Sequence, residues 1–214
     1  MNSLLKNIDA KKSVIFILLL IFLDQFVKIY IKLNYPITVY GDPAIIDLGF
    51  FKLLFIENKG MAMGARLNNL IPFLDDNSAK LILTFFRIFA CIGLGFWLRS
   101  IMKNKGSQLL IFCICLIFAG AVGNLIDSVF YGIIFSSSYG QVATLFPEAG
   151  YAYLFYGSVV DMLQFPLATW NWPNWLPIIG GQEYTFFEYV FNFADSYIST
   201  GVILLLIFNK KASI

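Results

Sequence analysis

The sequence predicts an all-α membrane protein with four transmembrane helices, both termini cytoplasmic, and a small extramembrane β-rich loop domain. Of its 214 residues, 59% are hydrophobic and only 13% are charged, whereas soluble domains carry roughly 25% charged residues. Four apolar runs are each close to the ~20 residues that cross a bilayer. Basic residues are frequent near both termini and in one short loop at 99–105, and none lies between 106 and 209. This asymmetry is the positive-inside pattern expected of a four-span protein.

The four spans are expected at about 13–33, 80–98, 108–130 and 189–208. They leave outer loops at about 34–79 and 131–188, so that residues 1–214 form a single integral membrane domain. The first run follows a basic segment, as a secretory signal does, but it continues to about residue 33 without a small-residue cleavage site. It is therefore predicted to be a transmembrane helix.

Two ionisable residues, Asp24 and Lys28, lie inside the first span. Their four-residue spacing puts them on one helix face, where pairing lowers the cost of burying either charge. Two interpretations stay open. The pair supports a functional site, or it only neutralises itself and orients the helix.

The first outer loop is expected to be a folded extramembrane unit. Leu48–Ile56 has the composition of a strand. Glu57–Gly64 is a polar turn containing glycine, and Asp75–Ser78 supplies N-cap side chains for the second span. The second outer loop contains a tryptophan cluster at 170–175, which is typical of an aromatic belt at the membrane surface.

The composition excludes several kinds of site. The chain has no histidine, which removes Ser-His-Asp and Cys-His catalysis and zinc sites that need imidazole. Its three cysteines, Cys91, Cys113 and Cys115, lie in apolar runs where buried thiols are the ordinary case. A net charge of +2 gives no basis for nucleic-acid binding. We expect no metal, no cofactor and no nucleic-acid partner.

Two matching motifs each place an aspartate at the end of a span. Asp127 follows Asn124 by three residues at the end of the third run, and Asp195 follows Asn192 by three residues at the start of the fourth. Because these two helices run in opposite directions, both aspartates reach the same outer face of the membrane.

Two carboxylates brought close in a poorly hydrated site share one proton. The charged member takes a proton from water as the water attacks an amide, and the neutral member donates to the developing oxyanion. The alternative is that each aspartate caps or hydrogen-bonds a helix end independently.

Five short motifs occur in order along nearly the whole chain. They are Asp24-x-x-x-Lys28, Asn58-x-Gly60-x-Ala62, Gly123-Asn124-x-x-Asp127, Val159-Val160-Asp161 and Phe191-Asn192-x-Ala194-Asp195. Each one alone is weak, but together they resemble the motifs of the lipoprotein signal peptidases (signal peptidase II), a family of intramembrane aspartyl proteases with four spans.

The resemblance implies an endopeptidase that removes the signal peptide of diacylglyceryl-modified prolipoproteins, cleaving before the lipidated cysteine. It also implies a bacterial inner-membrane location with the active site at the outer face, contact with membrane lipid, and binding of globomycin-type inhibitors. The catalytic pair implied is Asp127 and Asp195. Supporting or substrate-binding roles are implied for Asp24, Lys28, Asn58, Gly60, Gly123, Asn124, Asp161 and Asn192.

The chain departs from the family pattern in two places. The family usually has an arginine directly after the first aspartate, where this chain has Ser128. The substrate backbone therefore lacks its usual cation, and Lys59 or Arg66 from the first loop is a candidate replacement. Residues 131–156 resemble an insertion, which we expect to form an ordered surface lobe or lid.

Two functions of other classes stay open at this point. Intramembrane acids such as Asp24, Asp127 and Asp195 also serve proton-relaying transporter subunits, although four spans without inverted repeats lack the usual transporter architecture. A non-catalytic lipoprotein-binding membrane protein would bind the same prolipoproteins without cleaving them.

Overall fold

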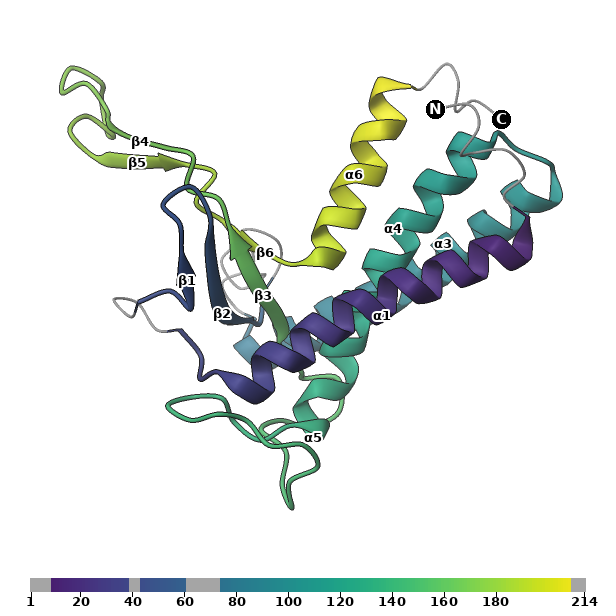
Figure 1. Cartoon of the computed structure of the whole chain (residues 1–214), viewed down its shortest axis with the longest axis horizontal. Helices are drawn as coiled ribbons and strands as arrows, with labels where there is room; N and C mark the ends of the chain where they lie inside the picture. Colours follow the sequence, from purple (N-terminus) through teal and green to yellow (C-terminus); the bar gives the residue numbers. More distant parts are fainter. Residues whose placement is uncertain (1–8, 39–42, 61–73, 209–214) are drawn as a thin grey trace.

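The computed structural model of the chain describes residues 9–38, 43–60 and 74–208. Within these residues four main helices form a bundle, and a small sheet lies at one end of it (Figure 1). Three of the helices, α1 (Ala10–Asn34), α3 (Asp76–Lys103) and α4 (Gln108–Ile126), are long and apolar enough to cross a membrane. The fourth, α6 (Phe193–Ile207), is apolar but shorter. These helices and the small sheet are the features of a membrane protein.

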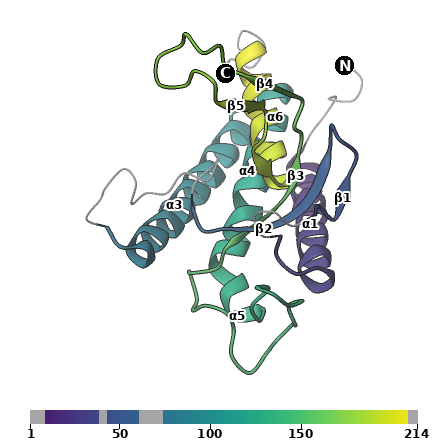
Figure 2. The ribbon, with the colours of Figure 1, turned by 90° about the vertical axis from the view of Figure 1, so that its left-hand side faces the viewer.

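Helix α4 is the centre of the bundle and contacts α1, α3 and α6. Figure 2 shows α1 and α3 on opposite sides of it. Small residues let its neighbours approach closely. A Cβ added to Gly120 would lie 2.3 Å from the carbonyl oxygen of Ala194, and one added to Gly123 would lie 2.7 Å from Oδ2 of Asp24.

The outward faces of the helices are apolar, and polar side chains point inward. Phe22, Phe86 and Phe96 are about two-thirds exposed, with exposed fractions of 68%, 67% and 70%. By contrast, Lys28 and Thr84 are fully buried. This is the arrangement expected where lipid is the solvent and polar groups are confined to the bundle interior.

Side-chain caps fix where the four main helices begin, and two of these caps bear on the sequence predictions. Asp75 accepts hydrogen bonds from the backbone nitrogens of Asn77 and Ser78, both at 3.1 Å, so α3 begins at the predicted N-cap segment. Helix α6 begins later than the predicted start of the fourth span at about residue 189, because Asn192 caps it and the two residues before the cap form a strand.

The sheet is built from both outer loops. Its strands are β1 (Ile46–Asp47), β2 (Lys52–Asn58), β3 (Val159–Gln164) and β6 (Val190–Phe191), in the order β1-β2-β3-β6, and all pairs are antiparallel. The predicted small β-rich loop domain is therefore present, but the second outer loop also contributes strands to its sheet, β3 and β6. The predicted strand at 48–56 is displaced, because Gly49 lies in a turn with φ of 79°.

A separate hairpin and a lobe complete the structure. Strands β4 (Ala168–Asn171) and β5 (Glu183–Phe186) pair with each other and extend away from the bundle (Figure 1). The rings of Trp170 and Tyr184 pack against each other there, 4.9 Å apart.

Beyond α4 the helix continues through a π-helical segment, η2 (Asp127–Tyr131), and a short α5 (Gly132–Ile134). Residues 135–158 then fold back over it, with Phe155 and Gly157 donating backbone hydrogen bonds of 3.0 Å to carbonyls in η2. The insertion is thus an ordered lobe. A π-helical turn inside a longer helix is frequent at functional sites, and this one begins at a predicted site residue.

Candidate active site

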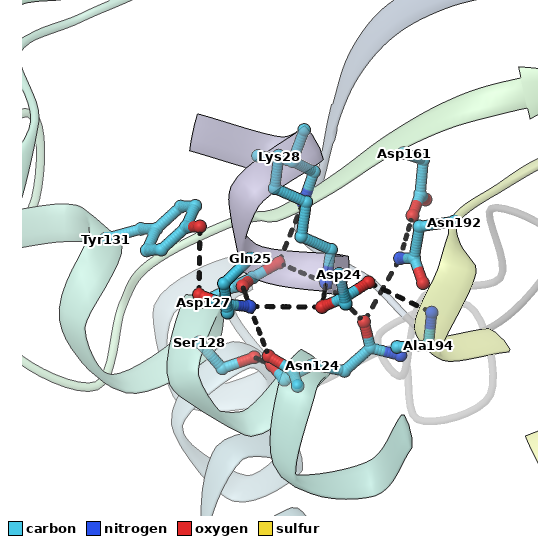
Figure 3. Close-up of polar contacts among 12 residues, drawn as sticks. Asp24, Gln25, Lys28, Asn124, Asp127, Ser128, Tyr131, Asp161, Asn192 and Ala194 are labelled. Carbon is cyan, nitrogen blue, oxygen red and sulfur yellow. Dashed lines mark hydrogen bonds and ion pairs between the residues drawn. The ribbon is translucent and has the colours of Figure 1, made fainter. Parts of the chain in front are cut away.

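A buried lysine joins two aspartates where α1 meets the end of α4. Lys28 Nζ lies 2.9 Å from Oδ2 of Asp24 and 2.8 Å from Oδ2 of Asp127, and it donates to Oδ1 of Asn124 at 3.0 Å (Figure 3). All three donors of the ammonium group are thus used. The predicted pairing of Asp24 with Lys28 is confirmed. Because Asp24 also accepts from the backbone nitrogen of Ala194 at 3.0 Å, this cluster holds α1, α4 and α6 together.

The carboxylate of Asp127 is fully enclosed. Besides Lys28, it accepts hydrogen bonds from Nε2 of Gln25 at 2.9 Å and from the backbone nitrogen of Val160 at 3.2 Å. Gln25 is itself held by the Tyr131 hydroxyl, which donates to its Oε1 at 3.0 Å. Asp127 is 0% exposed. A carboxylate with this set of partners is neutralised and fixed in place, and it has little access to a substrate.

Asp195 lies in the first turn of α6, in a capping box with Asn192. The Asn192 side chain accepts from the backbone nitrogen of Asp195 at 2.9 Å, and Oδ2 of Asp195 accepts from the backbone nitrogen of Asn192 at 3.3 Å. The other carboxylate oxygen accepts from Nδ2 of Asn124 at 2.8 Å. The two asparagines are also joined directly, since Asn192 Nδ2 donates to Asn124 Oδ1 at 3.1 Å. Asp195 is partly exposed, unlike Asp127.

Strand β3 brings a fourth aspartate, Asp161, to the same place. Its carboxylate accepts from Nδ2 of Asn192 at 2.7 Å and from Nδ2 of Asn58 at 3.0 Å. Burial and the nearby negative charge of Asp195 raise the pKa of Asp161 to about 7, against the opposing effect of the two hydrogen bonds and the more distant Lys28. An aspartate with a pKa near neutrality in a cluster of carboxylates is a candidate acid–base residue.

The hydrogen bonds join Asp195 more closely to Asp161 than to Asp127. One residue, Asn192, connects the carboxylates of Asp195 and Asp161. Two residues, Asn124 and Lys28, lie between the carboxylates of Asp195 and Asp127. The pair predicted from the sequence, Asp127 and Asp195, stays a prediction, and the structure adds Asp161 as a second candidate partner of Asp195.

The other predicted site residues lie around these carboxylates. Gly60 donates its backbone N–H to Oδ1 of Asn58 at 2.8 Å, so the turn after β2 is tied to the residue that bonds Asp161. Gly123 leaves room for the Asp24 carboxylate, as its Cβ contact shows. Ala62 of the same motif lies outside the described residues.

Sequence reasoning missed three residues that complete the site. Gln25 bonds both Asp24 and Asp127 and follows the first of them in sequence. Arg87 of α3 donates to Oγ of Ser128 at 2.6 Å. Lys32 of α1 pairs with Glu57 of β2. For Arg87 and Lys32 the available signal was the charge itself, because ionisable residues inside apolar spans are functional candidates by default. Gln25 is uncharged and gave no such signal.

Comparison with known proteins gives one consistent result. The family model described as Signal peptidase (SPase) II matches residues 16–210. The lipoprotein signal peptidase of Porphyromonas gingivalis is 44% identical over 211 residues, covering 97% of this chain and 87% of that protein. The lipoprotein signal peptidase of Amoebophilus asiaticus is 34% identical over 199 residues, covering 92% of this chain and 76% of that one.

Two solved bacterial membrane enzymes, obtained by the in meso method at 1.9 and 2.3 Å, share the fold. Their TM-scores are 0.58 and 0.57 at 23% and 22% identity, and the matches cover 95% and 94% of this chain and 96% and 89% of those chains. With the family model covering most of the sequence and relatives at 44% and 34% identity, the chain belongs to the signal peptidase II family.

Proposed function

We propose that this protein removes the signal peptides of prolipoproteins by adding water to an amide bond, with Asp161 and Asp195 as the acid pair. One observation carries the choice of pair: both carboxylates hydrogen-bond Asn192. The pKa of Asp161 near 7 supports it, because a pair that shares a proton needs one member that is neutral at working pH.

The reaction follows from this arrangement. The charged member of the pair takes a proton from a water molecule as the water oxygen attacks the scissile carbonyl carbon. The neutral member donates its proton to the carbonyl oxygen. When the resulting tetrahedral intermediate breaks down, a proton passes to the leaving nitrogen, the C–N bond breaks, and a free carboxyl and a free amine are released. Asp161 is suited to be the neutral member, since a pKa of about 7 leaves about half of it protonated at pH 7.

The asparagines have a positioning role in this proposal. Asn192 donates to Asp161 and caps the turn that carries Asp195, so it sets the distance between the two acids. Asn124 fixes the other oxygen of Asp195, and Asn58 the other oxygen of Asp161. Four oriented hydrogen bonds thus hold the pair before substrate arrives, which is the preorganisation that catalysis requires.

Asp127 is proposed to be structural. It anchors Lys28, and through Lys28 it fixes Asn124 against Asp195. Its role as a member of the catalytic pair stays a prediction from the sequence, and the experiment below separates the two assignments.

The membrane arrangement is proposed on the same basis. We infer one integral domain over residues 1–214 with four spans, both termini cytoplasmic, in the bacterial inner membrane. The start of α1, the α3–α4 connection and the end of α6 lie at the end of the bundle away from the sheet (Figure 1). Lys11, Lys12, Arg99, Lys103 and Lys105 lie near that end of the helices, which supports its cytoplasmic location by the positive-inside rule. The site would then be at the outer face.

The substrate is proposed to carry a diacylglyceryl-modified cysteine, with cleavage just before it. Its acyl chains would lie in membrane lipid beside the apolar outer faces of the helices. Globomycin-type cyclic peptides are proposed to bind the same place as the peptide. A transporter subunit or a non-catalytic lipoprotein-binding protein is not favoured, because the family is one of peptidases.

The test is a gel-shift cleavage assay on the purified protein, using a diacylglyceryl-modified prolipoprotein beside its unmodified precursor. Asp161→Asn and Asp195→Asn should each abolish cleavage of the lipidated form without lowering the melting temperature or preventing substrate binding. Asp127→Asn should retain cleavage in whatever fraction of the protein is folded, because the change leaves the proposed pair intact.

The opposite pattern would restore the assignment made from the sequence. If Asp161→Asn cleaves at the wild-type rate and folded Asp127→Asn is inactive, the pair is Asp127 with Asp195. Equal cleavage by the wild type and all three variants would exclude an aspartate mechanism altogether.

A further inference from the structure

Arg87 is a partly buried cation that has no role in the proposed reaction. It lies in the middle of α3, in an otherwise apolar span, and it faces the candidate site. Its guanidinium donates one hydrogen bond to Oγ of Ser128 at 2.6 Å and another to the carbonyl oxygen of Gly60 at 3.1 Å. A charged residue at this depth is costly and is a functional candidate by default.

The two bonds fix the guanidinium between the helices and the sheet. Ser128 also donates to the carbonyl oxygen of Asn124 at 2.9 Å, so its hydroxyl is oriented to accept from Arg87. Gly60 is held by Asn58, which bonds Asp161. Through Ser128 the cation is therefore connected to Asn124, which contacts Asp195. Through Gly60 it is connected to Asn58, which contacts Asp161.

Most of the binding capacity of the guanidinium is left over. Arginine has five N–H donors, and the two bonds to Ser128 and Gly60 use one donor on each terminal nitrogen. Within the described parts of the chain, the remaining donors have no partner. No carboxylate among these residues lies within ion-pair distance of Arg87, yet Asp127, Asp161 and Asp195 are all close enough to act on its charge.

Arg87 lies beside the position where the sequence lacks an expected arginine. The chain has Ser128 directly after Asp127 instead of an arginine, and the hydroxyl of that serine is bonded by an arginine from a different helix. Of the two replacements suggested by the sequence, Lys59 is exposed and Arg66 lies outside the described residues. Arg87 thus places a guanidinium group next to position 128.

We propose that Arg87 binds the substrate peptide at the cleavage site, its unused N–H groups donating to a backbone carbonyl and holding the scissile bond beside the acid pair. This inference rests on the proposed function. Ser128 is then the residue that positions Arg87. A planar, permanently charged group suits this role, because it donates two parallel hydrogen bonds in a fixed geometry and cannot lose its charge by burial.

The experiment measures kcat and KM for a synthetic diacylglyceryl-modified prolipoprotein peptide with five variants. Arg87→Gln should lower kcat/KM by roughly 10- to 100-fold, mostly through a raised KM, because a charge-assisted hydrogen bond to substrate is lost. Arg87→Lys should recover only part of this loss. Arg99→Gln is the matched control, since Arg99 is exposed near the C-terminal end of α3. It should leave both kcat and KM unchanged.

The decisive variant moves the cation back to the other helix. In Arg87→Ala/Ser128→Arg the new side chain at 128 can occupy the space vacated by Arg87, and kcat/KM should rise at least fivefold above that of Arg87→Ala. A purely structural role for Arg87 would not be rescued in this way.

A binding measurement separates this inference from the proposed function. In the inactive Asp195→Asn background, Arg87→Gln should weaken direct binding of the labelled peptide by a similar factor. If the wild type cleaves the peptide and folded Arg87→Gln has the same kcat/KM and affinity, the role of Arg87 is wrong and the acid pair is unaffected. A loss that the Ser128→Arg double variant does not rescue also overturns it. If Asp161→Asn still cleaves the peptide, the proposed pair of Asp161 and Asp195 is wrong. The peptide-binding measurement in the Asp195→Asn background still tests the role of Arg87.

Discussion

Replacing Asp161 with asparagine should stabilise the folded protein at alkaline pH and have little effect at acidic pH. Burial and the charge of Asp195 raise the pKa of the Asp161 carboxyl from 3.8 to about 7, so its ionised form is unfavourable in the folded state. In the unfolded chain the carboxyl has its ordinary pKa near 4. The folded protein therefore binds more protons than the unfolded chain between about pH 4 and pH 7, and its stability falls as the pH rises through that window.

The magnitude follows from the same two pKa values. At about 1.36 kcal/mol for each tenfold change in proton affinity, the rise from 3.8 to about 7 disfavours ionised Asp161 by about 4 kcal/mol at pH values above 7. Asparagine is neutral at every pH, but it keeps only one of the two acceptor oxygens that bond Asn58 and Asn192, a loss of about 1 kcal/mol. We expect a net gain of about 3 kcal/mol at about pH 8.5 and close to zero at about pH 5.

The assay is unfolding of the detergent-purified protein followed by tryptophan fluorescence, with wild type and variant compared at both pH values. Asp47→Asn is the matched control, because Asp47 belongs to the same sheet but is exposed and has a pKa lowered by the backbone N–H of Gly49. It should give no gain at pH 8.5. The reasoning is refuted if Asp161→Asn is no more stable than the wild type at pH 8.5, or if its gain is the same at both pH values.

Further outcomes are expected at other positions. If Asp161 is the neutral acid, kcat/KM should fall about tenfold for each pH unit above about 7, and a pH profile flat to pH 9 would remove it from that role. Lys28→Met should lower the free energy of unfolding by about 3–5 kcal/mol because it leaves two buried carboxylates unpaired, whereas Lys52→Met at a part-exposed pair should cost less than about 1 kcal/mol; equal effects would contradict this. Gly123→Ala should cost about 1–3 kcal/mol and reduce turnover, since its Cβ would lie 2.7 Å from a carboxylate oxygen. Gly93→Ala, with open space around it, is the comparison and should be tolerated.

The sequence could predict the parts of the site that depend on local spacing. Asp24 and Lys28 pair because residues four apart share a helix face, and this holds wherever the helix packs. Asn192 and Asp195 are three apart at the start of an apolar run, which is the spacing of a capping box, and they form one.

The long-range features could not be predicted from the sequence in this way. Nothing in the spacing of Asn58 and Asp161 shows that they meet across a β2–β3 pair, because register between strands from two separate loops is decided by tertiary packing. The same limit applies to the choice between Asp127 and Asp161 as the partner of Asp195. Asp127 has the same asparagine spacing as Asp195, but its carboxylate is paired with Lys28. That contact depends on how α1 packs against α4, which the sequence does not show.

The capping box at the start of α6 makes a single helical turn responsible for two tasks. The two hydrogen bonds between Asn192 and Asp195 that nucleate the helix also orient Asp195. The side-chain Nδ2 of the same Asn192 donates to the other acid, Asp161. Fraying of that turn would therefore withdraw both groups at once while the remaining helices stay packed. Heat inactivation would then report a local opening and would precede loss of the bundle, so amide hydrogen exchange at residues 193–196 should track residual activity more closely than global unfolding does.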